Sequence, residues 1–465
     1  MAMADWSPQF EKATFDKVAW RLIPLLFCCY IVAFLDRVNV GFAKLQMAPE
    51  LGFSDSVYGF GAGVFFIGYF LFEVPSNVIL ERVGARLWIA RIMITWGIIS
   101  ASFVFTNAIH WGGVARKLNC TDAEFTFYFL RFLLGASEAG FFPGVILYLT
   151  YWFPASRRGG MVARFMTAIA ISSVLGSPLS GAILEFLDQA AGWHGWQWLF
   201  LLEGLPSVLV GVLVFLLLPD SPEQASWLTS GERELVASRI TADETVKSEL
   251  GERRNFMEVF SDSRVWTLCL VYFCGVVCFY AVSFWMPTII QDAGLAKNDY
   301  LEVGLLAMIP WGLGAVTMVR WGIHSDCTGE RRWHSAAGLL CAMLGLLGLA
   351  LVDHHVGLGI LALSLVTVGL LSWMVTFWAL PTAFLSGTAA AAGIAWINSV
   401  GNLGGQVGPD LIGHIRTATG GADSGAFLTL AGIALLGALL TIMLSNTQRK
   451  LDAEIRPPLN MNRKS

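Results

Sequence analysis

Apolar stretches of about 20 residues, each long enough to cross the hydrocarbon core of a bilayer as a helix, follow one another along the whole chain. Short polar or charged segments separate them. This pattern predicts an all-α, polytopic membrane protein with twelve transmembrane helices, at 20–43, 57–79, 87–108, 126–151, 161–186, 197–218, 264–290, 301–323, 333–352, 357–381, 388–415 and 425–446.

A long polar segment at 219–263 divides six predicted spans from six. The pattern therefore predicts an N-terminal six-helix bundle at 1–218, a linker at 219–263, and a C-terminal six-helix bundle with a tail at 264–465. Within the linker, "SGERELVASRI" predicts a short amphipathic helix with Ser230 as its N-cap. Lys and Arg gather in the segments on one side of the predicted membrane, which places the linker and both termini in the cytoplasm.

Composition narrows the class of protein. Of the 465 residues, 55% are hydrophobic and 14% charged, whereas soluble domains carry roughly 25% charged residues. No dense basic block indicates a nucleic-acid partner. The chain contains neither H-E-x-x-H nor G-x-x-x-x-G-K-[ST], so we expect no enzyme, no metal site and no ATP-driven pump. A proton gradient is the expected energy source, with no cofactor.

The two halves repeat a short motif. The loops after spans 2 and 8 both show an acid, two residues, Gly, one residue and Arg, in "NVILERVGARLW" and "GIHSDCTGERRW". Gly allows a tight turn, and Arg can pin such a loop through a charge-assisted bond. The pattern predicts a gate built from Glu81, Arg82, Gly84 and Arg86 in the first half and Gly322, Asp326, Gly329 and Arg331 in the second. Two ordinary charged loops are the alternative.

The chain resembles the major facilitator superfamily in its twelve spans, its division into six and six, and these paired loops. The stretches "LDRVNVGFA", "GYFLFEVPSN", "RFLLGASEAGFFPG", "YWFPASRRG", "FWMPTII" and "NSVGNLGGQVGP" are similar to the anion:cation symporter family, and within it to bacterial tartrate, sugar-acid (galactonate, glucarate) and hydroxyphenylacetate permeases. Asn77 stands where the superfamily loop usually has Gly, and Glu81 where it has Asp. The resemblance implies two pseudo-symmetric bundles, alternating access, and a monomer in the bacterial cytoplasmic (inner) membrane.

Spans 1 and 4 carry ionisable residues at membrane depth, where a charge costs a few kcal/mol. Span 1 holds Asp36 and Arg37 side by side, and span 4 holds Arg131 and Glu138 about two turns apart on one face. The spacing predicts that the four groups meet in one cavity. Static ion pairs that tie the two helices together are the alternative, and Arg131 can either bind substrate or pair with Asp36.

These four charges predict a coupling mechanism. Deprotonated, the two carboxylates balance the two guanidinium groups; protonation of one leaves an arginine free for an anion. Proton and anion binding then favour each other reciprocally. The family resemblance likewise implies proton sites at the positions of Asp36 and Glu138, and anion-site or coupling residues at those of Arg37 and Arg131.

Further polar and aromatic residues are candidates for the cavity or the gate. A polar amide at membrane depth must face protein or water, which makes it either a substrate contact or a link between helices. Glu73, just before Pro75, is expected to be a gate element that pairs with loop arginines or a helix end. The candidate substrate contacts are Tyr69, which matches a family cavity tyrosine, Tyr280, Trp373, Trp378, Asn398 and Asn402.

The resulting hypothesis is a proton-coupled symporter that imports a small organic anion of the hydroxy-carboxylate, tartrate or sugar-acid class across the lipid bilayer. The alternative is a facilitative uniporter or exchanger of an aromatic or other carboxylate on the same fold. A nutrient receptor would need a long soluble signalling domain, which the sequence lacks.

Overall fold

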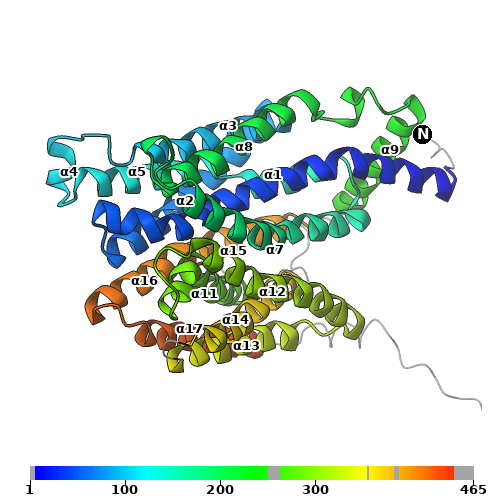
Figure 1. Ribbon diagram of the computed structural model, residues 1–465. Helices are drawn as coiled ribbons and strands as arrows, with labels where there is room; N and C mark the ends of the chain where they lie inside the picture. Colours follow the sequence, from blue (N-terminus) through cyan, green and yellow to red (C-terminus); the bar gives the residue numbers. More distant parts are fainter. Residues whose placement is uncertain (1–5, 250–261, 353–354, 382–386, 445–465) are drawn as a thin grey trace, which may run out of the picture.

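A computed structural model describes residues 6–249, 262–352, 355–381 and 387–444. All regular structure in these residues is helical, and the long helices lie roughly side by side (Figure 1). Residues 250–261 of the predicted linker, 382–386 after span 10 and the tail from 445 lie outside the described residues.

The first half of the chain supplies eight α-helices. They are α1 (Pro8–Leu51), α2 (Asp55–Val83), α3 (Ala85–Ala101) with a 3-10 turn (Ser102–Phe105), α4 (Gly113–Lys117), α5 (Asp122–Glu138), α6 (Phe141–Thr150), α7 (Ala155–Phe186) and α8 (Gly195–Leu217). Short 3-10 turns lie at Ala190–Gly192 and Pro222–Gln224. The linker contributes α9 (Ser230–Glu249).

The second half contributes α11 (Ser263–Asp292), α12 (Tyr300–Thr328), α13 (Arg332–Leu351), α14 (Val356–Phe377), α15 (Gly387–Asn402), α16 (Gly404–Thr419) and α17 (Ser424–Met443). In Figure 1 these helices form the lower part of the molecule and α1 to α8 the upper part. We call the end that holds the start of α1 the inner end and the opposite end, which holds α4, the outer end.

Eleven helical stretches among the described residues are long and apolar enough to cross a membrane. The remaining predicted span, span 11 at 388–415, consists of α15 and α16, two helices of 16 residues each. Large apolar side chains such as Leu216, Leu270 and Leu361 are exposed on the outer faces of these helices. Such an apolar surface suits contact with lipid. The helices also satisfy their backbone polar groups internally, which a lipid environment requires.

Spans 4 and 11 are both interrupted near their middle. In span 4, Ala139 leaves the helical region and Gly140 adopts a left-handed conformation with φ +84°, which separates α5 from α6. Glycine is favoured there for a second reason, since a Cβ on Gly140 would lie 2.4 Å from Ser76 Oγ. In span 11 the break falls at Leu403, between α15 and α16. Interrupted helices within a membrane are tolerated where protein or a cavity surrounds them.

The two halves touch closely through small residues near the outer end. A Cβ on Gly59 of α2 would lie 2.5 Å from the carbonyl oxygen of Pro409 in α16. A Cβ on Gly304 of α12 would lie 2.3 Å from the carbonyl oxygen of Ser177 in α7. These two crossings allow backbone-to-backbone contact, as small residues do at helix interfaces in membranes.

The linker helix α9 is attached to the start of α1. The structure corrects its predicted N-cap: Thr229, not Ser230, forms a capping box with Glu232, in which Glu232 N donates to Thr229 Oγ1 at 3.3 Å and Thr229 N to Glu232 Oε2 at 2.8 Å. Glu232 also pairs with Lys17 of α1 at 2.8 Å. Arg239 pairs with Glu11 of α1 at 2.6 Å, so α9 is held to the first half of the molecule.

Candidate functional site

A cavity of about 60 Å³ lies in the middle of the molecule, between the two halves. Six of the predicted substrate contacts line it: Arg37, Tyr69, Tyr280, Trp378, Asn398 and Asn402. The rest of the wall is mostly aromatic, from Tyr30, Phe34, Phe66, Phe142, Tyr272 and Phe279, with Val276, Ile169 and Met374. One guanidinium, two amides, four phenol hydroxyls and one indole N–H are therefore the polar side-chain groups of a largely aromatic cavity.

Arg37 connects the cavity to span 4 and to the second half. One terminal nitrogen, NH2, forms an ion pair with Glu138 Oε1, and the other, NH1, donates to the Tyr280 hydroxyl at 2.9 Å. The Arg37 side chain is 11% exposed, whereas that of Glu138 is fully buried. The guanidinium also lies 5.8 Å from the ring centroid of Tyr69. Arg37 and Glu138, two of the four charges that the sequence spacing was expected to bring together, are therefore in direct contact.

Glu138 occupies the last helical position of α5, immediately before the break in span 4. The preceding turn of α5 packs directly on α2, since a Cβ on Gly135 would lie 1.8 Å from the carbonyl oxygen of Phe65. This close packing holds the end of α5 in place, and with it the Glu138 carboxylate. Glu138 Oε2 is buried and has no hydrogen-bond partner among the described residues, so one oxygen pairs with arginine while the other is available to a proton.

Asp36 does not lie in this cavity, which corrects the prediction that all four charges meet there. Its carboxylate is fully buried and turned toward α3. It accepts hydrogen bonds from Trp96 Nε1 at 2.5 Å, from Asn39 Nδ2 at 3.1 Å and from the Ser100 hydroxyl. Adjacent residues on a helix point about 100° apart. The side chains of Asp36 and Arg37 therefore contact different helices.

Arg131 lies behind the cavity wall and forms no ion pair with a described residue. It is fully buried, and NH2 donates to the carbonyl oxygen of Ala62 at 2.7 Å. Its other guanidinium nitrogens have no hydrogen-bond partner in the described part of the chain. The Arg131 and Arg37 guanidinium groups lie 5.2 and 5.4 Å from the centroid of the same ring, Phe65. Among the described residues, Arg131 therefore neither pairs with Asp36 nor lines the central cavity.

Two other candidates have unexpected neighbours. Glu73 pairs across the halves, accepting from Asn398 Nδ2 at 2.8 Å and Ser399 Oγ at 2.6 Å, and not from loop arginines as expected. Asn398 therefore links α15 to α2 while it lines the cavity. Trp373 is fully buried and lies outside the cavity lining, packed against Gly275 and next to Tyr272. Because Tyr272 lines the cavity and Trp373 does not, Trp373 would affect a ligand there only by positioning Tyr272.

The paired loops at the inner end differ in their contacts. In the first loop, Gly84 has φ +92°. Arg86 N donates to Asp220 Oδ1 at 2.8 Å, so the carboxylate that this loop contacts comes from the segment after α8. Arg82 lies in the last turn of α2, and Glu81 lines a surface pocket with Asp220. In the second loop, Arg331 pairs with Asp326 itself, and Gly329 has φ +66° at the end of α12. Gly322 lies within α12.

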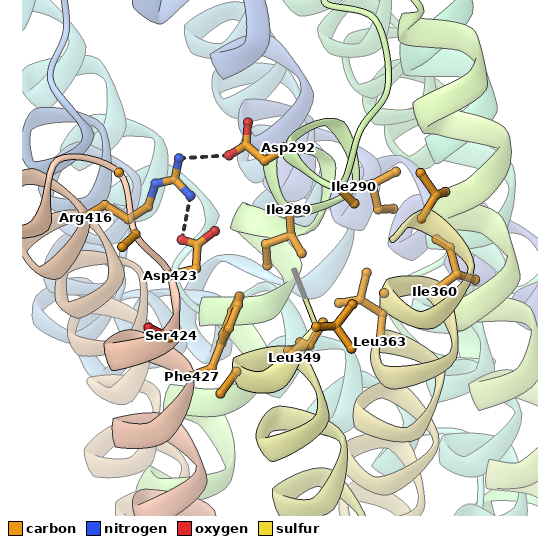
Figure 2. Close-up of a pocket in the computed structure, with 17 residues that line it drawn as sticks. Ile289, Ile290, Asp292, Leu349, Ile360, Leu363, Arg416, Asp423, Ser424 and Phe427 are labelled. Carbon is orange, nitrogen blue, oxygen red and sulfur yellow. Dashed lines mark hydrogen bonds and ion pairs between the residues drawn. The ribbon is translucent and has the colours of Figure 1, made fainter. Parts of the chain in front are cut away.

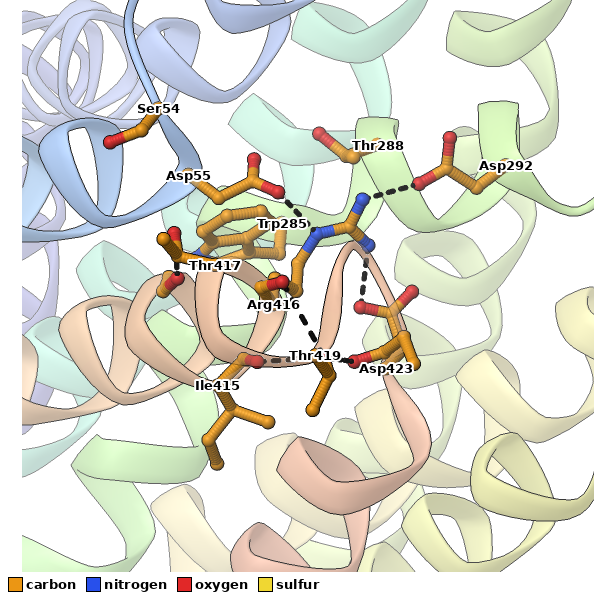
Figure 3. Close-up of polar contacts among 12 residues, drawn as sticks. Ser54, Asp55, Trp285, Thr288, Asp292, Ile415, Arg416, Thr417, Thr419 and Asp423 are labelled. Carbon is orange, nitrogen blue, oxygen red and sulfur yellow. Dashed lines mark hydrogen bonds and ion pairs between the residues drawn. The ribbon is translucent and has the colours of Figure 1, made fainter.

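The outer end is closed by a charge cluster that the sequence did not reveal. Arg416 at the end of α16 pairs with Asp55, Asp292 and Asp423 at 2.9, 2.9 and 2.5 Å (Figure 3). Asp55 belongs to the first half, and it also pairs with Lys44 of α1 at 2.9 Å. Burial raises the pKa of Asp423, and the attraction of Arg416 offsets this only in part.

A larger cavity of about 440 Å³ opens at the outer end of the second half. Figure 2 shows its apolar wall, with Ile289, Leu363 and Phe427, beside the ion pairs of Arg416 with Asp292 and Asp423. None of the predicted site residues lines it. Its one arginine pairs with three carboxylates, whereas Arg37 on the wall of the small central cavity pairs with one. The central cavity is therefore the better candidate for an anion site.

Sequence reasoning overlooked one further buried acid. Glu203 lies in the middle of α8 with 3% of its surface exposed. The signal was available, because Glu203 is the single charged residue of the predicted span at 197–218. A carboxylate in such a span is by default a candidate functional residue.

Comparison with known proteins identifies the fold and the family. A protein from Agrobacterium vitis named "Putative tartrate transporter" is 46% identical over 440 residues, which cover 95% of this chain and 93% of the relative. "Putative metabolite transport protein NicT" from Pseudomonas putida is 43% identical over 433 residues, covering 93% and 94%. The xylose transporter XylE from E. coli, in a partially occluded inward-open conformation, has the same fold with a TM-score of 0.70 at 14% identity, covering 92% of this chain and 98% of that one.

Residues 26–409 match the Major Facilitator Superfamily. This match spans most of the helices, the central cavity and both inner loops. With its apolar helices and its transporter-named relatives, the protein is a multi-pass membrane transporter and not an enzyme. The chain belongs to the Major Facilitator Superfamily.

Proposed function

We propose that the protein is a proton-coupled symporter that imports a small organic anion of the hydroxy-carboxylate, tartrate or sugar-acid class by alternating access. It would act as a monomer in the bacterial inner membrane, with both termini in the cytoplasm. The observation that carries the proposal is the ion pair between Arg37, which lines the central cavity, and the buried Glu138. Two relatives at 46% and 45% identity named "Putative tartrate transporter" support the substrate class.

The ion pair suggests how a proton and an anion would be coupled. While Glu138 is ionised, it neutralises Arg37, and a second carboxylate gains little by binding there. A proton on Glu138 removes that competition and leaves the planar guanidinium fork for the substrate carboxylate. By reciprocity, a bound anion strengthens proton binding to the same degree. Loss of both restores the ion pair, so each empty or fully loaded state avoids a lone buried charge.

Transport into proteoliposomes tests the proposal. Uptake is measured for a panel of radiolabelled tartrate, sugar acids and aromatic acids, each with and without an inward proton gradient. We expect the gradient to drive accumulation of a hydroxylated acid. Equal uptake in both conditions would contradict proton symport and favour a uniporter or exchanger.

Glu138→Gln tests the role of the carboxylate in the same assay. Gln has the size and hydrogen bonding of protonated Glu but cannot release a proton. The variant should bind substrate and exchange it across the membrane, yet fail to accumulate it when a pH gradient is applied. The matched control is Glu234→Gln, at an exposed position of α9, which should behave as wild type. Full pH-driven accumulation by a well-folded Glu138→Gln protein would remove Glu138 from the mechanism.

The aromatic wall favours a second candidate substrate, an aromatic carboxylate. The cavity offers its ligand several ring faces, including those of Tyr30, Phe34 and Phe279, but only one arginine. Ring stacking together with one guanidinium contact suits a planar acid better than a dicarboxylate that needs two cations. Preferred uptake of aromatic acids in the panel above would select this alternative.

A further inference from the structure

The first half of the molecule holds a second polar cluster, buried between α1, α3, α7 and α8 and separate from the central cavity. Glu203 of α8 accepts a hydrogen bond from the Ser180 hydroxyl of α7 at 2.7 Å. Asp36 and Asn39 of α1 lie close enough to interact with Glu203. The exposed fractions of Glu203, Ser180, Asn39 and Asp36 are 3%, 3%, 1% and 0%, so water does not screen this cluster.

The cluster contains two carboxylates, and no cation among the described side chains contacts them. Neutral donors surround Asp36, namely Trp96 and Ser100 of α3 and Asn39 of its own helix. Arg131 of α5 acts on Asp36 from a greater distance, without an ion pair. The charge of Asp36 acts on Glu203. The side chains that face the cluster from neighbouring helices are neutral: Trp96 and Ser100 of α3, and Ser180 of α7. Two like charges that interact within a buried site cannot both ionise at low cost.

Two buried oxygen atoms of the cluster that lack a hydrogen-bond partner among the described residues indicate where a proton would bind. Glu203 Oε2 and Asn39 Oδ1 are buried acceptors without a partner among the described residues. A proton on the Glu203 carboxyl group turns it into a donor, and the amide oxygen of Asn39 can accept from it. Asn39 already donates to Asp36 through Nδ2 at 3.1 Å. The amide would then connect the two carboxyl groups, donating to one and accepting from the other.

We propose that Glu203 and Asp36, bridged by Asn39, form a proton-binding pair that shares one proton, held mainly on Glu203, apart from the Arg37–Glu138 pair. Three donors keep Asp36 in its ionised form, whereas Glu203 accepts from a single hydroxyl. The role of this pair in transport rests on the proposed symport; its protonation does not.

Infrared spectroscopy of the detergent-solubilised protein tests the pair without any transport assay. The carbonyl stretch of a protonated, buried carboxylic acid should be present at neutral pH in wild type and missing in Glu203→Gln. Asp36→Asn removes the negative neighbour, so the band should persist but disappear at a less alkaline pH than in wild type. Ser207→Ala is the matched control: Ser207 is fully buried one turn further along α8, and its loss should leave the band unchanged.

Proton-driven uptake provides the second readout. In Glu203→Gln the pair no longer exists, and Asp36 alone should take up a proton only at more acidic pH, which shifts the uptake profile in that direction. An infrared band that is identical in wild type and Glu203→Gln would overturn the proposal, as would a band in wild type that is insensitive to Asp36→Asn. If wild-type uptake ignores the proton gradient, the symport proposal fails while the infrared result still decides on Glu203.

Discussion

The guanidinium of Arg37 uses two of its nitrogens, toward Glu138 and Tyr280, while its Nε has no hydrogen-bond partner among the described residues. Five N–H donors on a rigid plane allow such a group to exchange one carboxylate for another without leaving its place. At the scale of single residues, the pair therefore resembles a site in which a protein carboxylate stands where a substrate carboxylate would bind.

Arg37→Ala should abolish uptake and also destabilise the protein. Breaking a buried ion pair from one side costs roughly 3–5 kcal/mol, because the partner charge is left uncompensated. In the double variant Arg37→Ala/Glu138→Gln that charge is absent, so expression and thermal stability should recover while uptake stays lost. Thermal unfolding in detergent, paired with uptake measurements, distinguishes the two effects.

The control is Arg320→Ala, at an exposed position on α12, which should change neither property. Restored uptake in the double variant would show that Arg37 is needed only to balance Glu138.

The apolar pattern predicted that the charged residues of spans 1 and 4 lie at membrane depth, but not the direction in which each side chain points. Asp36 and Arg37 are neighbours along α1, and a rotation of the helix by one position exchanges their surroundings. Trp96 and Ser100, which surround Asp36, belong to a span whose sequence "TWGIIS" shows nothing beyond ordinary packing. The packing of α1 on α7 and α8, together with the hydrogen bonds that α3 donates, determines that Asp36 lies outside the cavity.

At the scale of helices, the apolar pattern predicted the spans well because a bilayer demands about 20 apolar residues from each. It did not predict where a span is interrupted. The breaks at Gly140 and Leu403 depend on close contacts with α2 and α11, such as that between Gly404 and the carbonyl oxygen of Phe273. Those contacts join residues far apart in the chain, so local periodicity carries no record of them.

Glycine contacts between helices of the two halves lead to a test of alternating access. Gly304→Val should wedge α12 away from α7, because its Cβ would meet the Ser177 carbonyl oxygen at 2.3 Å. Overpacking of this kind costs roughly 1–3 kcal/mol, which corresponds to a shift of about 5- to 150-fold between closed and open states of the outer end. Distances between spin labels across the outer end should lengthen.

Gly312→Val provides the control on the same helix, since nothing lies within 4 Å of its added Cβ. Unchanged outer-end distances in Gly304→Val would mean that the close contact does not hold this end shut.

At the scale of the whole molecule, polar contacts between the halves lie at different depths. The Arg416–Asp55 ion pair joins them at the outer end, where Lys44 Nζ also donates to Thr288 Oγ1 at 3.3 Å. Nearer the inner end, Glu73 of α2 accepts hydrogen bonds from Asn398 and Ser399 of α15. Separation of the two halves at the outer end would break Arg416–Asp55, whereas the bonds of Arg416 to Asp292 and Asp423 lie within the second half. The arginine thus keeps two carboxylate partners while its bond to the first half is broken.

The closed outer end also provides the protein with a built-in optical reporter. Trp285 is fully buried; Lys44 lies 4.1 Å and Arg416 5.4 Å from its ring, and Tyr58 approaches edge-on at 5.2 Å. Lys44 and Tyr58 belong to the first half, so opening of the outer end would remove a cation and a phenol from the indole and admit water. Although the chain has 18 Trp, the difference in emission between wild type and Trp285→Phe isolates this one. Each turnover would then be visible as a fluorescence change in the unlabelled protein.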